Sequence, residues 1–285
     1  MTETSQSQGR RSRGGPHAGQ HTEPEAMVDR DRYPISEPGA GFESLARRCR
    51  EQLRATGCCI LPGFLTDDAV ARALDDANGL VPAGHHSEIS NGSAYLEIPD
   101  LSWPEGHART LTGPTSLTAV AYDRFPSESP VRCLFEWDPL MRFLAAALGK
   151  ERLYRYDDAL GALNLAVMGP GDQLWWHFDQ TDFVVSIALQ DAEEGGDFEY
   201  APLVRDAGDE RYESVERVLR GDAGGIVGVP MEPGTLMLFE GRHSLHRVTP
   251  ITGERLRLVA LLAYDTKPGT CSSELLRAFR YGRTG

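Results

Sequence analysis

The chain has 285 residues with 42 acidic and 29 basic side chains, a formal net charge of −13, and a 40% hydrophobic content typical of a globular protein with one substantial core. This acidic balance argues against binding to nucleic acid or to an anionic membrane through bulk charge. There is no signal peptide or membrane-spanning apolar run, and the five cysteines include no C-x-x-C pair, so we expect a soluble cytoplasmic protein.

The first 40 residues predict a disordered tail. They are rich in Ser, Gly, Pro, Gln and charged residues and contain few apolar side chains, so the entropy cost of ordering them should exceed the free energy gained by burial. His17 and His21 lie in this tail, and we interpret them as solvated side chains. The folded domain is expected over residues 41–285, without repeats or internal linkers.

Three helical segments are predicted before the main block of strands. Apolar residues recur at helical spacing over 42–56, and Gly57 is a natural helix stop. A second helix over 66–80 begins with a threonine cap followed by two aspartates. The third runs over 138–149, and the apolar segment 58–64 predicts a short strand between the first two.

Beyond residue 150 the pattern changes to alternating or continuous apolar runs, which predict strands. These runs are ERLYRY at 151–156, ALNLAV at 162–167, LWWHFD at 174–179, FVVSIAL at 183–189, GIVGV at 225–229, TLMLF at 235–239 and RLRLVALLAY at 255–264. A polar insertion over 201–224, with a short helix over 212–219, interrupts them. Helices followed by strands indicate an α+β domain, most simply a β-sandwich or open barrel flanked by N-terminal helices.

A histidine and an aspartate stand one residue apart on a predicted strand. Alternate residues of a strand share a face, so His177 and Asp179 should project together, with Trp175 beside them. His246 opens a later strand in an H-x-V-x-P pattern and completes a two-histidine, one-carboxylate set that suits non-haem Fe(II). His243 is the alternative to His246, but it precedes the strand and lacks that pattern, so we interpret it as a loop residue or a neighbour of the site.

Together with a Gly-Gly turn at 195–196 and an arginine nine residues past His246, these motifs resemble the Fe(II)/2-oxoglutarate-dependent dioxygenases, whose fold is a double-stranded β-helix or jelly roll. The resemblance extends over about residues 130–265. It implies that His177, Asp179 and His246 bind iron, and that Arg255 pairs with the distal carboxylate of 2-oxoglutarate.

Arg257 is the alternative to Arg255 as the partner of that carboxylate. The two arginines are two apart on a predicted strand and should face the same side, and a planar guanidinium pairs bidentately with a carboxylate. Asn164 is expected either to help hold the cosubstrate or only to satisfy a neighbouring backbone group.

The segments HFDQTDFVVSIALQ, ERVLRG and LFEGRHSLHRVTP are similar to a narrower bacterial branch that hydroxylates or halogenates free and N-substituted amino acids and related small metabolites. In that branch the halogenases replace the carboxylate ligand by Gly or Ala. Asp179 keeps the carboxylate, so the resemblance implies hydroxylation of an unactivated C–H bond, with O2 consumed and succinate and CO2 released from 2-oxoglutarate. Ascorbate is the expected reductant in vitro, and desaturation and epoxidation stay open as other oxidative outcomes.

Three residues are candidates for binding the small-molecule substrate. Arg205 lies in the insertion, where rim loops of a rigid scaffold form lids, and the alternative is an ion pair with a nearby acid such as Asp206 or Asp209. Gln180 follows the ligand pair and could hydrogen-bond an amide or amine. Trp175 either lines the pocket or is part of the core.

Two other classes of protein remain as alternatives for the whole chain. One is a non-catalytic cupin-like or lectin-like β-sandwich in which the histidines and the aspartate make structural hydrogen bonds. The other is a metal-dependent isomerase or hydrolase on a cupin barrel. His85 and His86 lie in a predicted Gly-rich loop, 82–93, and are expected to face solvent. The pattern predicts no oligomeric state.

Overall fold

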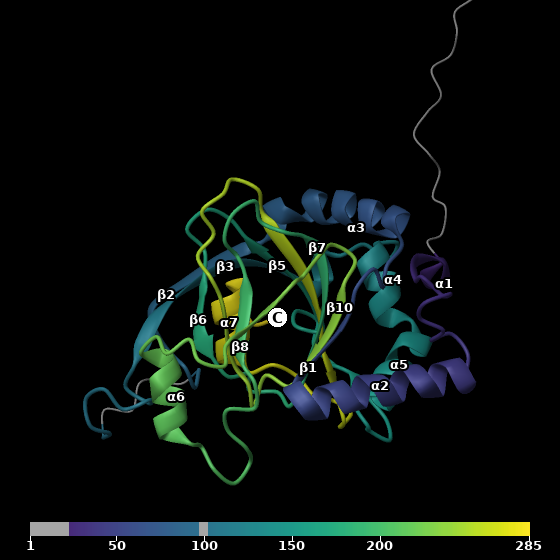
Figure 1. Cartoon of the computed structure of the whole chain (residues 1–285). Coiled ribbons are helices and arrows are strands. Elements are labelled where there is room, and N and C mark those ends of the chain that lie inside the picture. Colours follow the sequence, from purple (N-terminus) through teal and green to yellow (C-terminus); the bar gives the residue numbers. More distant parts are fainter. Residues whose placement is uncertain (1–22, 97–101) are drawn as a thin grey trace, which may run out of the picture.

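Two antiparallel sheets face each other around a shared interior in the computed structural model, which describes residues 23–96 and 102–285 (Figure 1). The larger sheet has the strand order β1-β10-β7-β12-β5-β3-β2. Its strands are β1 (Cys58–Leu61), β10 (Leu236–Phe239), β7 (Val184–Gln190), β12 (Arg257–Leu262), β5 (Leu163–Met168), β3 (Thr112–Ala121) and β2 (His85–Ser93).

The smaller sheet carries two of the predicted metal ligands and has the order β6-β11-β8-β9. Its strands are β6 (Leu174–His177), β11 (Leu245–Val248), β8 (Phe198–Ala201) and β9 (Val227–Val229). A third, two-stranded sheet pairs β13 (Tyr264–Asp265) with β4 (Tyr154–Arg155). Inner residues of the two main sheets form one cluster, which includes Met168 and Met237 from the larger sheet and Phe198 and Val248 from the smaller.

Helices cover the outer face of the larger sheet (Figure 1). They are α1 (Pro24–Met27), α2 (Ala40–Thr56), α3 (Asp67–Leu80), α4 (Pro130–Glu136) and α5 (Asp138–Ala147), with short 3-10 turns η1 (Val81–Ala83) and η2 (Tyr122–Arg124). Strand β12 shows how the two faces divide, because Leu258, Ala260 and Leu262 enter the helix-covered cluster while Leu261 packs against the inner one. The remaining helices are α6 (Tyr212–Leu219) and α7 (Glu274–Tyr281).

These sheets and helices confirm the predicted α+β class with a double-stranded β-helix core and flanking N-terminal helices. The predicted helices form for the expected local reasons. The side chain of Thr66 caps α3 by accepting a hydrogen bond from the backbone N–H of Ala69 at 3.3 Å. Gly57 ends α2 in the left-handed region, with φ of 73°. Within the described residues, no helix is long and apolar enough to cross a membrane.

The packed part of the chain begins before residue 41, the predicted start of the domain. Met27 and Ile35 are fully buried, and Val28 and Tyr33 join them in the helix-covered cluster. The average composition of residues 1–40 did not reveal this packing, because the few apolar residues lie among charged ones. These residues are ordered because their side chains are buried against the domain. Residues 1–22, with His17 and His21, lie outside the described residues.

The predicted loop at 82–93 was also wrong, because most of it forms β2 and pairs with β3 over His85–Ser93. This segment is polar and largely exposed, with the burial of an edge strand, so it shows little of the apolar alternation by which a strand is predicted. The C-terminal helix α7 was not predicted.

Candidate metal centre

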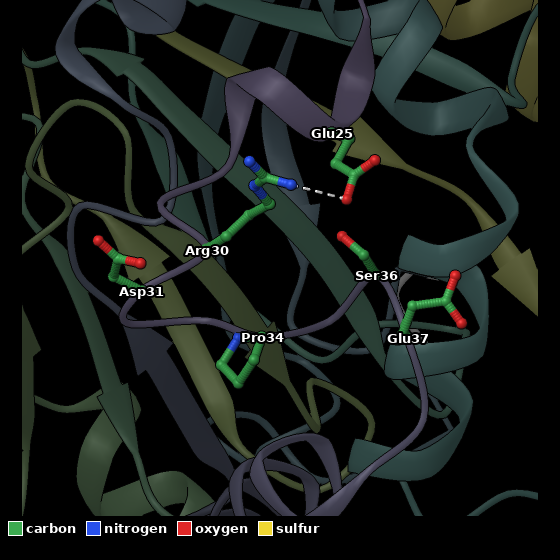
Figure 2. Close-up of a pocket in the computed structure, with 6 residues that line it drawn as sticks. All are labelled: Glu25, Arg30, Asp31, Pro34, Ser36 and Glu37. Carbon is green, nitrogen blue, oxygen red and sulfur yellow. Dashed lines mark hydrogen bonds and ion pairs between the residues drawn. The ribbon is translucent and has the colours of Figure 1, made fainter.

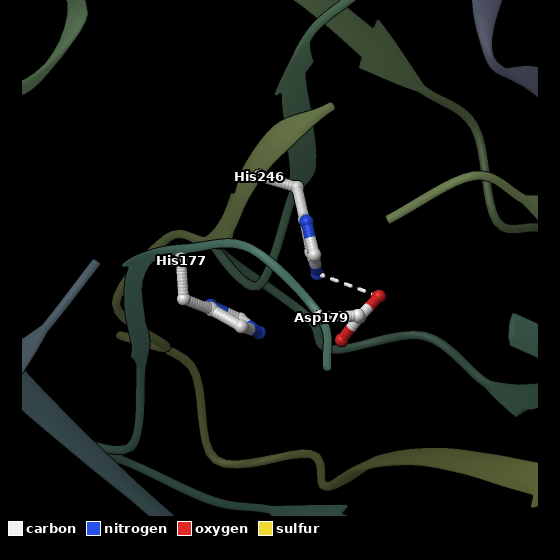
Figure 3. A group of neighbouring side chains, drawn as sticks. All are labelled: His177, Asp179 and His246. Atoms are coloured by element: carbon white, nitrogen blue, oxygen red, sulfur yellow. Dashed lines mark ion pairs between the residues drawn. The ribbon is translucent and has the colours of Figure 1, made fainter. Parts of the chain in front are cut away.

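The three predicted metal ligands meet at the end of the smaller sheet (Figure 3). His177 ends β6 and His246 lies in β11, and the two residues are directly paired across the antiparallel ladder. Asp179 follows β6 by two residues. One ligand atom from each of the three lies within 4.8 Å of the others, and Oδ2 of Asp179 is 3.5 Å from Nε2 of His246.

The backbone selects which nitrogen of each histidine faces the centre. Nδ1 of His177 lies 2.7 Å from the carbonyl oxygen of Trp175, and Nδ1 of His246 lies 3.0 Å from that of Ser244. A carbonyl oxygen only accepts hydrogen bonds, so Nδ1 carries the proton in both neutral rings and Nε2 keeps its lone pair. This is the arrangement in which a hydrogen bond at one nitrogen orients the other toward a metal.

Asp179 reaches the histidines because a glycine lies beside it. The backbone N–H of Asp179 donates to the carbonyl oxygen of Gly241 at 3.0 Å. A Cβ atom added to Gly241 would collide with Oδ2 of Asp179. The glycine in the FEGRH segment was not predicted to be part of the site, and only the three-dimensional approach of the two loops reveals its role.

Burial keeps the histidines neutral. Loss of hydration, together with the neighbouring His246, lowers the pKa of His177 to about 3, and burial lowers the pKa of His246 to about 4. Burial also raises the pKa of Asp179, partly offset by His177 and by Arg280 of α7. Neutral imidazole nitrogens and one carboxylate are a donor set that fits Fe(II), and a bound cation would stabilise the ionised carboxylate.

The two candidate arginines do not share a face, contrary to prediction. Arg255 is exposed and precedes β12, and its guanidinium donates to the carbonyl oxygens of Asp191 at 2.9 Å and Ala192 at 3.1 Å. Arg257 is the first residue of β12 and only 6% exposed. Strand alternation applies only inside the strand, and Arg255 lies outside it, so the expectation that the two arginines share a face was wrong.

Arg257 is a buried cation with no hydrogen bond or ion pair among the described residues. Loss of hydration lowers its pKa to about 10, against the attraction of Asp191 and Asp197. Its aliphatic stem lies against Gly196, where an added Cβ would approach Cδ of the arginine to 3.2 Å. An unpaired buried guanidinium is costly, and a carboxylate ligand would offset that cost.

Asn164 and Ser186 place polar groups on the same inner face of the larger sheet. Asn164 alternates with Ala166 on β5, and Ser186 alternates with Ala188 on β7, and both alanines belong to the inner cluster. The hydroxyl of Ser186 is buried and has no hydrogen-bond partner among the described residues. The prediction missed Ser186, although a serine within the apolar run FVVSIAL was a usable signal.

Arg205 forms the ion pair weighed as the alternative to substrate binding, but with a different acid. Its Nη1 donates to Oε2 of Glu210 at 2.7 Å, and its side chain is only 12% exposed. The guanidinium carbon lies 3.7 Å from the ring centroid of Phe178, the residue between His177 and Asp179. Arg205 therefore supports the segment that carries two of the ligands.

The other two predicted substrate residues lie in different surroundings. Gln180 is exposed, and its backbone carbonyl accepts a hydrogen bond from Arg242. Trp175 lies so closely over Gly113 of β3 that a Cβ there would collide with the indole, and its Nε1 is buried without a hydrogen-bond partner in the described part of the chain. His243 lies in the turn before β11 and is not part of the group of three ligands.

Two surface hollows lie apart from this centre. One, of about 260 Å³, is formed by residues before α2 and is crossed by the 3.0 Å hydrogen bond between Arg30 and Glu25 (Figure 2). The other, of about 560 Å³, includes the exposed Arg255. Neither contains a predicted metal ligand, so the chemistry of the donor set, and not the size of a hollow, identifies the site.

The comparisons with known proteins agree with this fold. Residues 107–275, more than half of the chain, match the family model described as Halogenase D. An oxidoreductase of the 2OG-Fe(II) oxygenase family from Burkholderia pseudomallei is 15% identical, with a TM-score of 0.51 over 79% of this chain and 92% of that chain. The search of curated proteins found no match for this chain.

Two further solved structures share the fold. A prolyl hydroxylase from Trichoplax adhaerens, in complex with a hypoxia inducible factor peptide fragment, is 15% identical with a TM-score of 0.52, covering 80% of this chain and 94% of that chain. The epimerase SnoN, in complex with Fe3+, alpha ketoglutarate and nogalamycin RO, is 17% identical with a TM-score of 0.51, covering 81% and 93%. At these identities the likeness establishes the fold of the Fe(II)/2-oxoglutarate oxygenases.

Proposed function

The chain belongs to the Halogenase D family, and from this premise we propose that it is an Fe(II)- and 2-oxoglutarate-dependent oxygenase that hydroxylates a C–H bond of a small metabolite, an amino acid or an amino-acid derivative. The observation that carries the proposal is the convergence of His177, Asp179 and His246 on one point with both Nε2 atoms facing it. Three ligands on one side of an iron leave open positions for a cosubstrate and oxygen.

In this proposal, different side chains of the site bind the iron and the 2-oxoglutarate. His177, Asp179 and His246 would hold the iron, which when bound supplies the oxidation of 2-oxoglutarate by O2 to succinate and CO2 and the attack on the substrate C–H bond. Arg257 would bind the distal carboxylate of 2-oxoglutarate bidentately, in place of Arg255, because its guanidinium is buried and has no partner among the described residues.

The inner polar residues and the predicted substrate residues have supporting roles in this proposal. Asn164 and Ser186 offer hydrogen bonds to the cosubstrate from the same wall as Arg257. Trp175 brings an indole N–H that has no partner in the described part of the chain, a donor suited to a bound polar group. Arg205 positions the ligand segment through Phe178, and Gln180 stays a candidate at the exposed rim.

Halogenation is the second candidate reaction, and the description of the matching family favours it. A halogenase needs an open position for a halide where a hydroxylase has a carboxylate ligand. Asp179 offers a carboxylate 3.5 Å from Nε2 of His246, which would occupy that position in this chain. We therefore put hydroxylation first.

One experiment tests both reactions. Purified protein is incubated with Fe(II), ascorbate, 2-oxoglutarate, O2 and chloride over a panel of free and N-acylated amino acids, with Asp179→Ala as the control. Succinate that rises with one panel member, together with a product heavier by one oxygen, supports hydroxylation, and a chlorinated product supports the second candidate.

The same experiment separates the other classes of protein. A binding module would form no succinate, and a cupin isomerase or hydrolase would convert its substrate without consuming O2 or 2-oxoglutarate. If the iron-loaded protein neither binds 2-oxoglutarate nor forms succinate, the oxygenase proposal is overturned.

A further inference from the structure

The turn over residues 240–244, between β10 and β11, contacts two of the three candidate ligands. The carbonyl oxygen of Gly241 accepts the hydrogen bond from the backbone N–H of Asp179 at 3.0 Å. The carbonyl oxygen of Ser244 lies 3.0 Å from Nδ1 of His246. Asp179 lies beyond the end of β6, so the ladder between β6 and β11 does not fix its position. The carboxylate is therefore placed relative to the second histidine through this turn.

Arg242, in the middle of the turn, extends to the segment that carries Asp179. Its Nε lies 2.7 Å from Oδ1 of Asp182, and its Nη2 donates to the backbone carbonyl oxygen of Gln180. One guanidinium thus holds the residue that follows the carboxylate ligand and also a side chain three positions after it. A planar guanidinium presents several donors in a fixed fork, which suits two acceptors on one segment better than an ammonium does.

Arg205 holds the same two segments from the insertion that follows β8. Its backbone N–H donates to the carbonyl oxygen of His243 at 3.3 Å, and its Nε donates to that of Arg242 at 2.8 Å. Its guanidinium carbon lies 3.7 Å from the ring centroid of Phe178, the residue between the first two ligands. The ion pair with Glu210 fixes the guanidinium in this place. Arg205 and Arg242, called the arginine pair below, join three segments that are far apart in the sequence.

A purely stabilising role does not account for these contacts. The side chains of Arg242 and Asp182 are 44% and 64% exposed, and ion pairs exposed to this degree contribute little to folding stability. The effect of the contacts is local, because they act on the segment that follows β6 and on the turn before β11. Without them, the backbone hydrogen bond to Gly241 would have to hold the Asp179 carboxylate largely by itself.

We propose that the arginine pair positions Asp179, so that these two side chains govern how tightly the site binds its metal without supplying a ligand atom. A ligand that its neighbours already orient loses less conformational freedom on binding, and removal of such neighbours lowers metal affinity. The inference rests on the proposed function for the identity of the metal, Fe(II).

The test measures metal affinity in variants of the full-length protein. Each variant is titrated without oxygen with Fe(II) and with Co(II), whose visible absorption reports the geometry of its ligands. Arg242→Ala should weaken binding of both metals about tenfold, the lower end of the effect of residues that orient a ligand, and shift the Co(II) absorption toward that of Asp179→Ala. Asp182→Asn keeps the contact with Gln180 and should weaken binding only about two- to fivefold.

Two conservative variants test the geometry of the contacts. Arg242→Lys should recover part of the affinity, because it keeps a positive charge beside Asp182 but has no planar fork. Arg205→Lys should weaken binding, because it keeps a charge beside Phe178 but lacks the Nε donor to the carbonyl oxygen of Arg242.

Arg220→Ala is the matched control. Arg220 is 54% exposed and makes the same two kinds of contact, from Nε to Oε1 of Glu216 and from Nη2 to the carbonyl oxygen of Gly106, both at 2.8 Å. Neither partner lies beside a ligand, so the metal affinity should not change. The urea midpoint of metal-free Arg242→Ala should equal that of Arg220→Ala, and with saturating Fe(II) its KM for 2-oxoglutarate should equal the wild-type value.

The outcomes separate this inference from the proposed function. Equal metal affinity in Arg242→Ala and the wild type overturns the inference, and so does an equal loss in Arg220→Ala. A loss of affinity that accompanies a lower urea midpoint than the control shows a structural role and overturns it as well. If Asp179→Ala binds Co(II) as tightly as the wild type, both proposals fail. If the wild type binds Co(II) through Asp179 but forms no succinate with Fe(II), the proposed function alone fails, and the order of Co(II) affinities still decides the role of the arginine pair.

Discussion

The two faces of the larger sheet differ in how completely their side chains are satisfied. The outer face meets the helices through apolar side chains that are fully buried, among them Leu163 and Leu258 of the sheet and Phe143 of α5. The inner face carries polar groups between its apolar residues, including Arg257 and the hydroxyl of Ser186, neither of which has a side-chain partner within residues 23–96 and 102–285. Both faces are built from the same strands, so one sheet stabilises the fold on one side and offers ligand contacts on the other.

This difference implies that the outer face of the sheet governs folding stability and the inner face governs ligand affinity. Removing an outer side chain should cost folding free energy and leave ligand affinity intact, because the candidate metal centre lies on the inner side of the sheet. Changing an inner polar group should cost ligand affinity with little loss of stability, because its interactions are unmet until a ligand binds.

Phe143→Ala should have the largest effect of these substitutions, and the effect should be on the free energy of unfolding alone. The ring is fully buried in the helix-covered cluster, with its centroid 6.0 Å from that of Phe42, so its loss leaves a cavity and should cost about 3–5 kcal/mol of unfolding free energy. Urea unfolding measures the change. Leu275→Ala is the control, since that side chain is 82% exposed and should change stability by less than about 0.5 kcal/mol. A Phe143→Ala protein with unchanged stability but altered 2-oxoglutarate affinity would contradict the view that the outer side governs stability and the inner side governs binding.

Gly241→Ala should act on the metal centre instead. The new methyl group would collide with the carboxylate of Asp179 and turn it away, which should weaken Fe(II) binding about 10–100-fold, as for a residue that orients a ligand. Anaerobic Fe(II) titration measures this. Gly228→Ala is the matched control because its added Cβ meets nothing within 4 Å. Equal Fe(II) affinity in the two variants would show that Asp179 does not bind the metal from this position.

Arg257→Gln should raise the KM for 2-oxoglutarate by roughly tenfold or more, as expected for a charged hydrogen bond worth about 1.5–3 kcal/mol. Arg255→Gln should have little effect, because its guanidinium is exposed and bonds only backbone carbonyls. Succinate release at varied 2-oxoglutarate compares the two. A larger effect from Arg255→Gln would restore the assignment made from the sequence.

Thr66→Ala should have the smallest effect and again only on the helix-covered side. It removes the hydrogen bond from Ala69 N–H to the threonine hydroxyl that caps α3, which typically costs about 1 kcal/mol. The midpoint of urea unfolding should fall while the KM for 2-oxoglutarate stays constant. A changed KM would mean that α3 also governs the inner face.

Local rules were sufficient for a large part of the fold. The cap at Thr66 and the stop at Gly57 depend on neighbours in the chain, and neighbours are visible in a sequence. Asp179 was expected to alternate with His177 on one strand, but β6 ends at His177 and Asp179 reaches the group from the segment that follows. The pairing of His246 with His177 is not local, and it was predicted only because the motifs resemble a known family.

The errors arose where tertiary contacts decide. Arg255 and Arg257 differ because β12 begins between them, and a boundary shifted by two residues moves a guanidinium from the interior to the surface. The short helix α7 was missed although its sequence is amphipathic and carries local signals, since Ser273 caps its start and Gly282 ends it in the left-handed region. Ser186 is a similar case, because a single serine within an apolar run was a visible signal in the sequence but was not used to predict a site residue.

The hydrogen bonds that the two histidines donate to the carbonyl oxygens of Trp175 and Ser244 bear on which metal this chain binds. Because the backbone already orients both imidazoles, the site is assembled by folding and does not wait for iron to arrange it. Preassembled nitrogen and carboxylate donors bind later divalent metals, such as nickel or copper, more tightly than Fe(II). The metal found in protein isolated from cells would then depend more on which metals were available during synthesis than on any preference of the chain for iron. Reconstitution with Fe(II) therefore has to begin with removal of the metals already bound.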